Sequence, residues 1–411
     1  MSNPYGFGIV AALAMTSVAL AGGNDGKNRS ADSNEPAPLQ DTINVTAAAG
    51  KGITFSTEGF RLNLSNRIQV NLGYANLENA EDTLGVRIRR ARTKLSGDAY
   101  KDTVHFVLQF EWADGQTNDI NDALIIWDFY KTDNNEMSLR FGQGKTLFGT
   151  EATGTAAGLE FIDRARATQM FANTRSRQAQ VVGKMNGGRF RWNAGVLNND
   201  VAAASLGASE DGNNFSNELN WIAGVSYGTG QDEIYGEARK QGALQEYTET
   251  QWVANASIHY GQNDATDVGA EYDAFTLSIG GALWTGRMHF LAEVFVRDEN
   301  ADNTALAIES QAFGWQAGGT YTLEPGPSIQ WGYGVRVSGV HITDVTGANQ
   351  PIFFLGAEGD IFEIQLVASA YYVGHNLKTQ FGYTFQSLDP DAPGVPDSTN
   401  HIIELQSQIV F

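Results

Sequence analysis

The sequence contains no cysteine and only 9 prolines among its 411 residues. Without cysteine it has no disulfide framework, no thiolate metal site and no residue for a lipid anchor. It also lacks an excess of basic residues, since its formal net charge is −20. This charge excludes the basic footprint of a nucleic-acid-binding protein. No apolar run after the N-terminus is long enough for a membrane-spanning helix, so a membrane location would require a closed barrel of strands.

Glycine and aromatic residues are abundant, with 46 glycines and 11 % aromatics. Both suit a protein of many strands that has tight turns and aromatic girdles. Residues 7–21 form an apolar run ending in Ala-Leu-Ala, which predicts a signal peptide over 1–21, although no basic residue precedes it. A short buried helix is the alternative. Residues 22–52 are polar and predict a flexible segment, and 53–411 predict the folded domain.

An alternation of apolar and polar residues begins at residues 60–74, FRLNLSNRIQVNLGY, interrupted at Asn66. Because successive side chains of a strand face opposite sides, one face of this strand is apolar and the other is polar. Its length exceeds the roughly 9–11 residues of a tilted bilayer span. The pattern recurs along the chain and gives sixteen to eighteen candidate strands, with 233–240 and 252–260 the doubtful ones. Bacterial barrels have an even number of strands, and we predict sixteen.

The fold class predicted is therefore an all-β transmembrane antiparallel barrel. With the N-terminus in the periplasm, the long connections face outward. The third of them, residues 147–177, interrupts the alternation, and long loops of this kind are usually functional. We expect it to fold inward, narrow the pore and carry a short helix at 158–171; an ordinary surface lid is the alternative. Its charged residues, the candidates for the constriction, are Glu151, Glu160, Asp163, Arg164, Arg166, Arg175 and Arg177.

The last residues, HIIELQSQIVF, alternate toward a terminal Phe411. This ending resembles the signal by which the barrel-assembly machinery reads outer-membrane proteins. Together with the signal peptide it predicts a protein of the bacterial outer membrane, in contact with membrane lipid and lipopolysaccharide.

Basic residues recur on the polar strand faces, where fixed positive charge in a narrow pore favours anions. Pairing with luminal carboxylates, which would stiffen the wall, is the alternative. The run VRIRRARTK at 86–94 breaks the alternation, because Arg90 and Arg92 would share the lipid-facing side with Ile88. Lipid-facing arginine costs about 2–4 kcal/mol at the midplane, so a bulge, or a position near the rim or a subunit contact, must redirect these side chains. The predicted luminal-wall arginines are Arg61, Arg67, Arg140, Arg189 and Arg191.

Three motifs resemble those of the phosphate-selective porin O and P family. They are the Arg-rich run that ends in LSGDAY at 95–100, RFGQGK at 140–145, and FG-x-E at 148–151. The resemblance implies a homotrimer of sixteen-stranded barrels, each with an inward third loop that guides anions. By position it makes pore residues of Arg89, Arg90, Lys145, Arg164 and Arg166. Ala152 occupies the position where phosphate-selective members place a lysine, which puts strict phosphate selectivity in doubt.

We therefore predict a passive porin for small anions or other hydrophilic solutes, without a cofactor. A general diffusion porin of weak selectivity is the first alternative. An outer-membrane enzyme, or a structural barrel with a plugged lumen, is the alternative of another class. The six histidines are scattered, and none lies in a motif of nucleophilic or metal-assisted catalysis.

Overall fold

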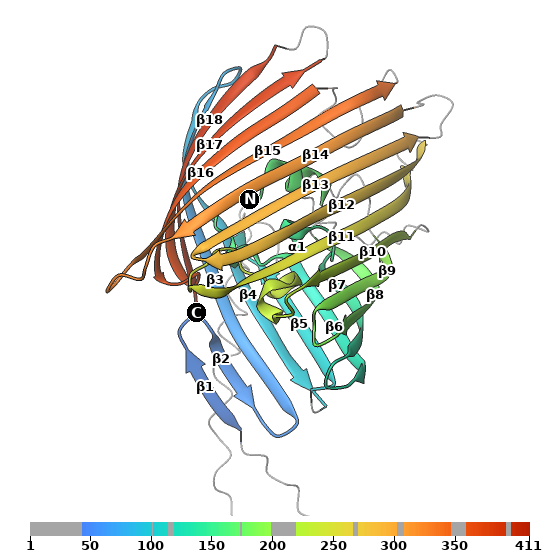
Figure 1. Cartoon of the computed structure of the whole chain (residues 1–411), viewed down its shortest axis with the longest axis vertical. Helices are drawn as coiled ribbons and strands as arrows, with labels where there is room; N and C mark the ends of the chain where they lie inside the picture. The colour runs from blue at the N-terminus through green and yellow to red at the C-terminus, as the bar shows by residue number, and fades with distance from the viewer. Residues whose placement is uncertain are drawn as a thin grey trace, which may run out of the picture. The chain divides into compact units, whose positions relative to one another are not determined.

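The computed structural model describes residues 43–411 except 101, 114–118, 173–174, 199–218, 266–269, 302–307, 347–358 and 392–395. The predicted signal peptide lies outside this part of the chain. Sixteen antiparallel strands form a closed barrel (Figure 1). They are β3 (Phe60–Leu77), β4 (Thr83–Ala99), β5 (Val104–Glu111), β6 (Asp119–Lys131), β7 (Glu136–Lys145), β8 (Arg175–Met185), β9 (Phe190–Asn198), β10 (Asn220–Gly228), β11 (Tyr247–Ala265), β12 (Ala270–Gly286), β13 (Met288–Ala301), β14 (Ile308–Thr322), β15 (Gln330–Thr346), β16 (Gly359–Val373), β17 (Leu377–Pro390) and β18 (Ser398–Val410).

Each strand pairs with its neighbours in sequence, and β18 pairs with β3 to close the barrel. The closing register runs from Asn400 opposite Leu77 to Val410 opposite Arg67. Just beyond it, the backbone of Phe411 exchanges two hydrogen bonds with Asn66, at 2.6 and 3.0 Å. Closure pairs the backbone groups of the first and last strands, which a bilayer could not hydrogen-bond. The predicted count of sixteen strands is confirmed.

The alternation in sequence becomes two faces of the wall. On β13, Val294 and Val296 are exposed, whereas Glu293 and Arg297 on the opposite face are buried. Exposed aromatic and aliphatic side chains on the other strands follow the same rule. Apolar side chains therefore face lipid and polar ones face the lumen, as membrane barrels require.

The basic run on β4 is redirected by a bulge. Val70 on β3 lies opposite Ile88, but the next pair is Gln69 opposite Arg90, so Arg89 is an extra residue on β4. One extra residue reverses the facing of everything that follows it. Arg90 therefore shares the luminal face with Gln69, which accepts a hydrogen bond from its Nη1 at 2.8 Å. The predicted bulge is confirmed.

A hairpin precedes the barrel. Strands β1 (Asn44–Ala48) and β2 (Gly52–Ser56) pair with each other, and β2 extends the sheet along the start of β3. The prediction of a flexible segment through residue 52 is therefore wrong for residues 44–48. That prediction was based on the low apolar content of the segment. The hairpin is ordered in another way, because the backbone of β2 pairs with β3 and that of β1 pairs with β2.

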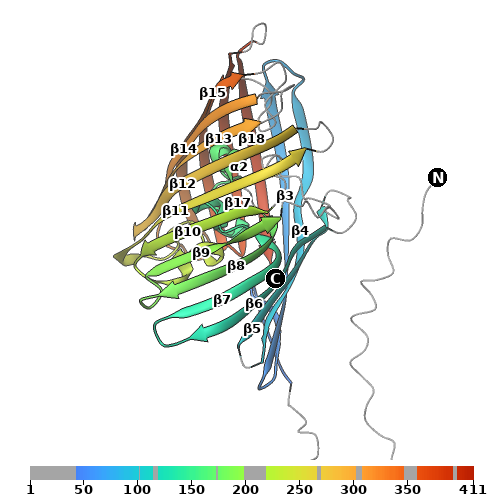
Figure 2. The same cartoon turned by 90° about the vertical axis from the view of Figure 1, so that its right-hand side faces the viewer.

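Two connections carry helical turns. The third loop, described over residues 146–172, contains α1 (Thr150–Thr153), the 3₁₀ turn η2 (Ala156–Gly158) and α2 (Arg166–Phe171). The 229–246 segment, between β10 and β11, contains η3 (Asp232–Ile234) and η4 (Gly236–Ala238). In Figures 1 and 2 these turns are surrounded by the strands. Of the doubtful strands, 252–260 lies within β11, and 233–240 belongs to the 229–246 segment. No helix among the described residues is long and apolar enough to cross a membrane.

The predicted helix at 158–171 is helical only in its last six residues. The reason lies in the wall, since Lys378 on β17 donates to the carbonyl of Leu159 and Gln380 donates to that of Glu160, both at 2.5 Å. Two carbonyls that a helix would use internally are therefore hydrogen-bonded to the barrel.

Two apolar clusters lie inside the strand wall. The larger joins Phe148 and Phe171 of the third loop to Phe295 of β13, with the rings of Phe171 and Phe295 stacked at 5.3 Å. The second joins Ile234 and Tyr235 of the 229–246 segment to Trp284 and other residues of β11 to β13. Apolar burial thus fixes both connections against the wall.

Candidate functional site

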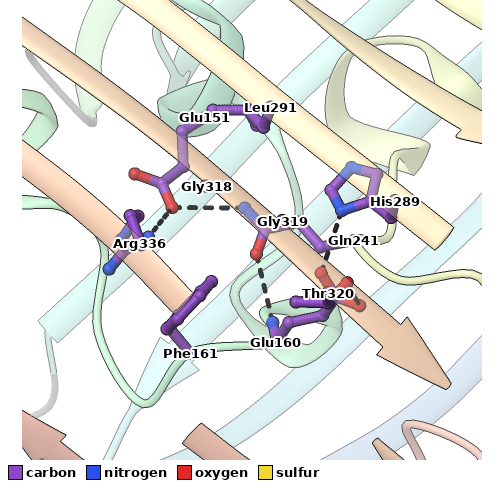
Figure 3. Close-up of a pocket in the computed structure, with 10 residues that line it drawn as sticks. All are labelled: Glu151, Glu160, Phe161, Gln241, His289, Leu291, Gly318, Gly319, Thr320 and Arg336. Carbon is purple, nitrogen blue, oxygen red and sulfur yellow. Dashed lines mark hydrogen bonds and ion pairs between the residues drawn. The ribbon is translucent and has the colours of Figure 1, made fainter. Parts of the chain in front are cut away.

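The third loop is attached to the wall by buried charged groups. Glu151, with no exposed side-chain surface, forms an ion pair with Arg336 of β15 (Figure 3). The Nε2 of Gln241 donates to the same carboxylate at 3.2 Å, and the backbone N–H of Ala165 donates to it at 3.0 Å. Arg336 also donates to the carbonyl of Asp163 at 2.6 Å. One buried ion pair therefore connects both halves of the loop to the barrel.

A second carboxylate of the loop, Glu160, is as deeply buried. It accepts a hydrogen bond from Thr320 of β14, and Nδ1 of His289 on β13 lies 2.9 Å from its Oε2 (Figure 3). The backbone N–H of Glu160 donates to Gln241 at 3.1 Å. Glu160 is thus surrounded by partners from three parts of the chain and is a structural anchor.

Wall carboxylates hold the two short helices in turn. Glu293 of β13 accepts hydrogen bonds from the backbone N–H groups of Thr150 and Glu151. Glu363 of β16 accepts one from the N–H of Arg166 at 3.3 Å. These contacts satisfy donors at helix starts, where no intrahelical partner exists.

Electrostatics keep Glu151 ionised. Burial alone would raise its pKa, but Arg336, Arg164 and hydrogen bonds from Ala165 and Gln241 outweigh burial and lower the pKa below its usual value. An ionised carboxylate between two guanidinium groups strengthens the attachment of the loop.

The 229–246 segment meets the third loop inside the barrel. It starts from the end with the short turns, which is the periplasmic end in such barrels. The N–H of Thr155 donates to the carbonyl of Arg239 at 3.1 Å, and that of Gln241 donates to Gly158 at 2.8 Å. Glu237 holds the segment to β7 through two hydrogen bonds from Arg140, at 2.8 and 3.1 Å. Connections from opposite ends of the barrel therefore support each other.

Arg164 of the loop lies in a group of basic residues. Its guanidinium donates to the loop carbonyls of Gly154 at 3.1 Å and Ala152 at 3.3 Å. Burial lowers the pKa of Arg164; Glu151 opposes this effect, and Arg175 adds to it. Five of the cations that interact electrostatically with Arg164 lie on β3, β4, β7 and β8: Arg67, Arg89, Arg90, Lys145 and Arg175. We call these six residues the basic cluster.

Carboxylates neutralise part of this cluster. Asp163 of the third loop forms an ion pair with Arg89 of β4, and Asp122 of β6 accepts from Nε of Arg175 at 2.9 Å. The Nζ of Lys145 instead donates to two loop carbonyls, those of Thr153 and Gly154.

The remaining predicted residues lie elsewhere. Arg177 lies on β8 opposite Gln143 of β7. Arg61 pairs with Asp98 near the start of β3, and Arg189 is exposed at the turn before β9.

Arg140 and Arg191 both bind the 229–246 segment. Arg140 holds Glu237, as described, and Arg191 pairs with Asp232 and lies 4.0 Å above the ring of Tyr235. Two predicted wall residues are thus attachment points of an internal segment.

Sequence reasoning did not find the anchoring role of Arg336, Glu293 and Glu363. Their signal is a charged residue in mid-span, which is costly to bury unless it has a partner. The role of Gln241 had no comparable signal. Among the described residues, no group of three or more His, Cys, Asp or Glu is placed to hold a metal ion.

The closed sixteen-stranded wall, with apolar residues outside and charged ones inside, defines an outer-membrane channel protein. The family model of phosphate-selective porins O and P matches residues 60–325, and the chain belongs to that family. Its location is the bacterial outer membrane. No curated protein matches the chain in sequence.

Solved structures share the fold. The outer-membrane channel DcaP of Acinetobacter baumannii is 14 % identical, with a TM-score of 0.60, over 89 % of this chain and 100 % of that one. An anion-selective porin from Comamonas acidovorans is 10 % identical, with a TM-score of 0.56, over 85 % and 100 %. OprB of Pseudomonas putida is 10 % identical, with a TM-score of 0.54, over 86 % and 94 %.

Proposed function

We propose that this channel is a passive porin that admits small hydrophilic solutes and favours anions at the basic cluster. The observation that carries the proposal is the electrostatic grouping of Arg164 with Arg67, Arg89, Arg90, Lys145 and Arg175. Fixed positive charges close together in a narrow lumen lower the barrier for anions and raise it for cations.

The third loop supplies the narrowing in this proposal. Its buried anchors, Glu151 and Glu160, hold it against β13 to β17, so that Arg164 faces the arginines of β3 and β4 across the remaining space. The ion pair between Arg89 and Asp163 joins the third loop to β4 beside the basic cluster. A constriction held on both sides would keep its width as solutes pass.

The family and an anion-selective relative in fold support an anion preference, whereas Ala152 argues against strict phosphate selectivity. Asp163 and Asp122 neutralise part of the positive charge of the basic cluster. This favours a second candidate function, that of a general diffusion porin with weak ion selectivity. The channel is not an enzyme in this proposal, since Glu160 and His289 serve as a buried anchor.

Assembly and targeting complete the proposal. Residues 1–21 act as a cleaved signal, and Phe411 is read by the barrel-assembly machinery. The mature barrel contacts lipid and lipopolysaccharide and forms a homotrimer.

Planar-bilayer recording tests the function. Under a KCl gradient the reversal potential should show that chloride is more permeant than potassium, and added phosphate should reduce the current. Substitutions Arg164→Gln and Arg90→Gln should each move the reversal potential toward that of a non-selective pore. Lys131→Gln is the matched control, because Lys131 is exposed and outside the basic cluster. A preference for potassium in the wild type would contradict the anion preference, and the absence of conductance would contradict the channel.

A further inference from the structure

Two cations share one carboxylate at the periplasmic end of the strands. Lys184 lies one residue before the end of β8, and Arg191 is the second residue of β9. Asp232 of η3 bridges them, because its Oδ1 lies 2.9 Å from Nζ of Lys184 and also pairs with Nη2 of Arg191. A single carboxylate thus balances only one of the two positive charges.

The guanidinium of Arg191 is held in place by groups other than Asp232. Its Nε donates to the carbonyl of Gly188 at 3.3 Å, and the guanidinium lies 4.0 Å above the ring of Tyr235. The hydroxyl of Tyr235 in turn donates to the carbonyl of Arg189 at 2.9 Å. Arg191 therefore keeps its orientation if Asp232 moves away, and so does the part of the 229–246 segment that carries Tyr235.

Asp232 is the most exposed member of the group. Its side chain is 68 % exposed, compared with 33 % for Lys184 and 24 % for Arg191. The carboxylate therefore lies on the solvent side of the two cations and can leave them by rotation of its side chain. Since exposed ion pairs contribute little stability, an anion in solution can compete with Asp232 for the same two donors.

A cavity inside the barrel reaches both cations. It has a volume of about 280 Å³, and its lining includes Thr153 of the third loop as well as Lys184 and Arg191. Asn193 and Ser226 add uncharged polar groups to this lining. Since water occupies about 30 Å³ per molecule, the cavity has room for a compact organic solute beside the cations. None of the six residues of the basic cluster lines it, so it is a different place from the proposed constriction.

We propose that Lys184 and Arg191 bind the carboxylate of a small monocarboxylate solute, and that Asp232 occupies this site when no solute is bound. The two cations already hold a carboxylate of the chain itself, through charge-assisted hydrogen bonds that a solute carboxylate can also accept. Glu136 lines the same cavity and disfavours a second negative charge on the solute. The inference rests on the proposed function in that the lumen must admit solutes, and it adds a solute class and a periplasmic site with a built-in competitor.

A fluorine label beside Asp232 tests the site locally. The sequence has no cysteine, so the substitution Gln231→Cys, at an exposed position, takes a single trifluoromethyl label. The labelled full chain in detergent micelles is titrated with L-lactate and followed by fluorine NMR at constant ionic strength, because salt screens exposed charges. We expect a saturable shift of the label with L-lactate and none with lactamide, its uncharged amide.

Three variants of the labelled chain locate the binding. Asp232→Ala should lower the half-saturating lactate concentration about fivefold, because a competing ion pair of about 1 kcal/mol is removed. Lys184→Gln should raise that concentration by about the same factor, since one of the two cations is lost. Asp133→Ala is the matched control: it removes an exposed carboxylate from the turn between β6 and β7 and should titrate as the wild type does.

An unchanged half-saturating concentration in Asp232→Ala would overturn the proposal, because Asp232 would then not compete with the solute. Unchanged titration of Lys184→Gln would also overturn it, since lactate would then bind elsewhere. A larger effect of inorganic phosphate than of lactate at equal concentration would overturn the carboxylate assignment. A protein that conducts ions but shows no saturable shift, even in Asp232→Ala, would overturn the site and leave the porin function standing. Conversely, saturable lactate binding without conductance would support the site and contradict the porin function.

Discussion

Removing the charge of Glu151 should detach the third loop from the barrel wall. In Glu151→Gln the guanidinium of Arg336, which is 3 % exposed, remains buried without its carboxylate. Removing one partner of a buried ion pair costs about 3–5 kcal/mol, because the other charge is left uncompensated. The lower value, taken for an isosteric amide, corresponds to roughly a 150-fold increase in the detached population. The strands themselves should be unaffected, since their backbone pairing does not involve Glu151.

Single-channel recording measures this change. We expect Glu151→Gln to visit states of higher conductance and weaker ion selectivity, because Arg164 loses its position. Hydrogen exchange of residues 150–171 should rise in parallel. The matched control is Asp360→Asn, which removes a carboxylate from an exposed pair with His341; exposed pairs contribute about 0–1 kcal/mol.

The double variant Glu151→Gln with Arg336→Met separates the ion pair from other effects. Removing both buried charges is often nearly neutral, so the double variant should recover much of the wild-type conductance. If Glu151→Gln conducts and exchanges as the wild type does, the reasoning that the buried pair holds the loop is refuted. Lowering the pH should have the same effect as this substitution. Because the pKa of Glu151 is lowered in the folded state, the stabilisation that its ionised carboxylate gives to the attached loop is fully present above the pKa of an unfolded glutamate, about 4.3. It is lost as the pH falls through the folded value.

Three further predictions concern other parts of the barrel. Deletion of Arg89 removes the bulge but leaves Ile88 opposite Val70 and Arg90 opposite Gln69, so the following arginines should still face the lumen and heat-resistant barrel should still accumulate in membranes; a loss of folded barrel would contradict this register. The pKa of Asp232 is lowered, and that of Glu237 is lowered to about 2. The ion pairs of these two carboxylates should therefore persist at pH 5. Hydrogen exchange of the 229–246 segment, corrected for intrinsic rates, should rise only as the pH falls from about 4 toward 2. Deletion of Phe411 removes its two backbone hydrogen bonds to Asn66, and pulse-chase assays should show slower conversion to the folded barrel.

The wall was predictable from sequence because the period of two is a local property. In β3, each apolar residue follows a polar one, and the bilayer requires that alternation at every position. The same alternation showed that Arg90 and Arg92 could not share the lipid face with Ile88 in mid-membrane. It left a bulge, a rim position and a subunit contact open, and the structure has the bulge. Short strands were harder to predict. Residues 233–240 mix polar and apolar residues, a pattern that fits either a short strand or a turn, and in the structure they belong to the 229–246 segment.

The attachment of the third loop was not predictable in the same way. The loop sequence shows Glu151 and Glu160, but the partners that bury them, Arg336 and His289, are more than a hundred residues away. Periodicity assigns those partners to the luminal face and gives no information about which loop residue each one meets. The helix predicted at 158–171 was wrong over most of its length for a related reason, because wall side chains compete for its backbone carbonyls.

The 229–246 segment changes how the interior should be understood. A loop anchored only to the wall can move as a lid about its two ends, whereas this loop is also bonded to a segment that enters from the opposite end. Gln241 donates to Glu151 and accepts from the backbone of Glu160, so one side chain connects both loop anchors. The segment is in turn held to β7 by Arg140 and Glu237. The width at the basic cluster therefore depends on contacts at the periplasmic end, and substitutions there should alter ion selectivity without touching any residue of the cluster.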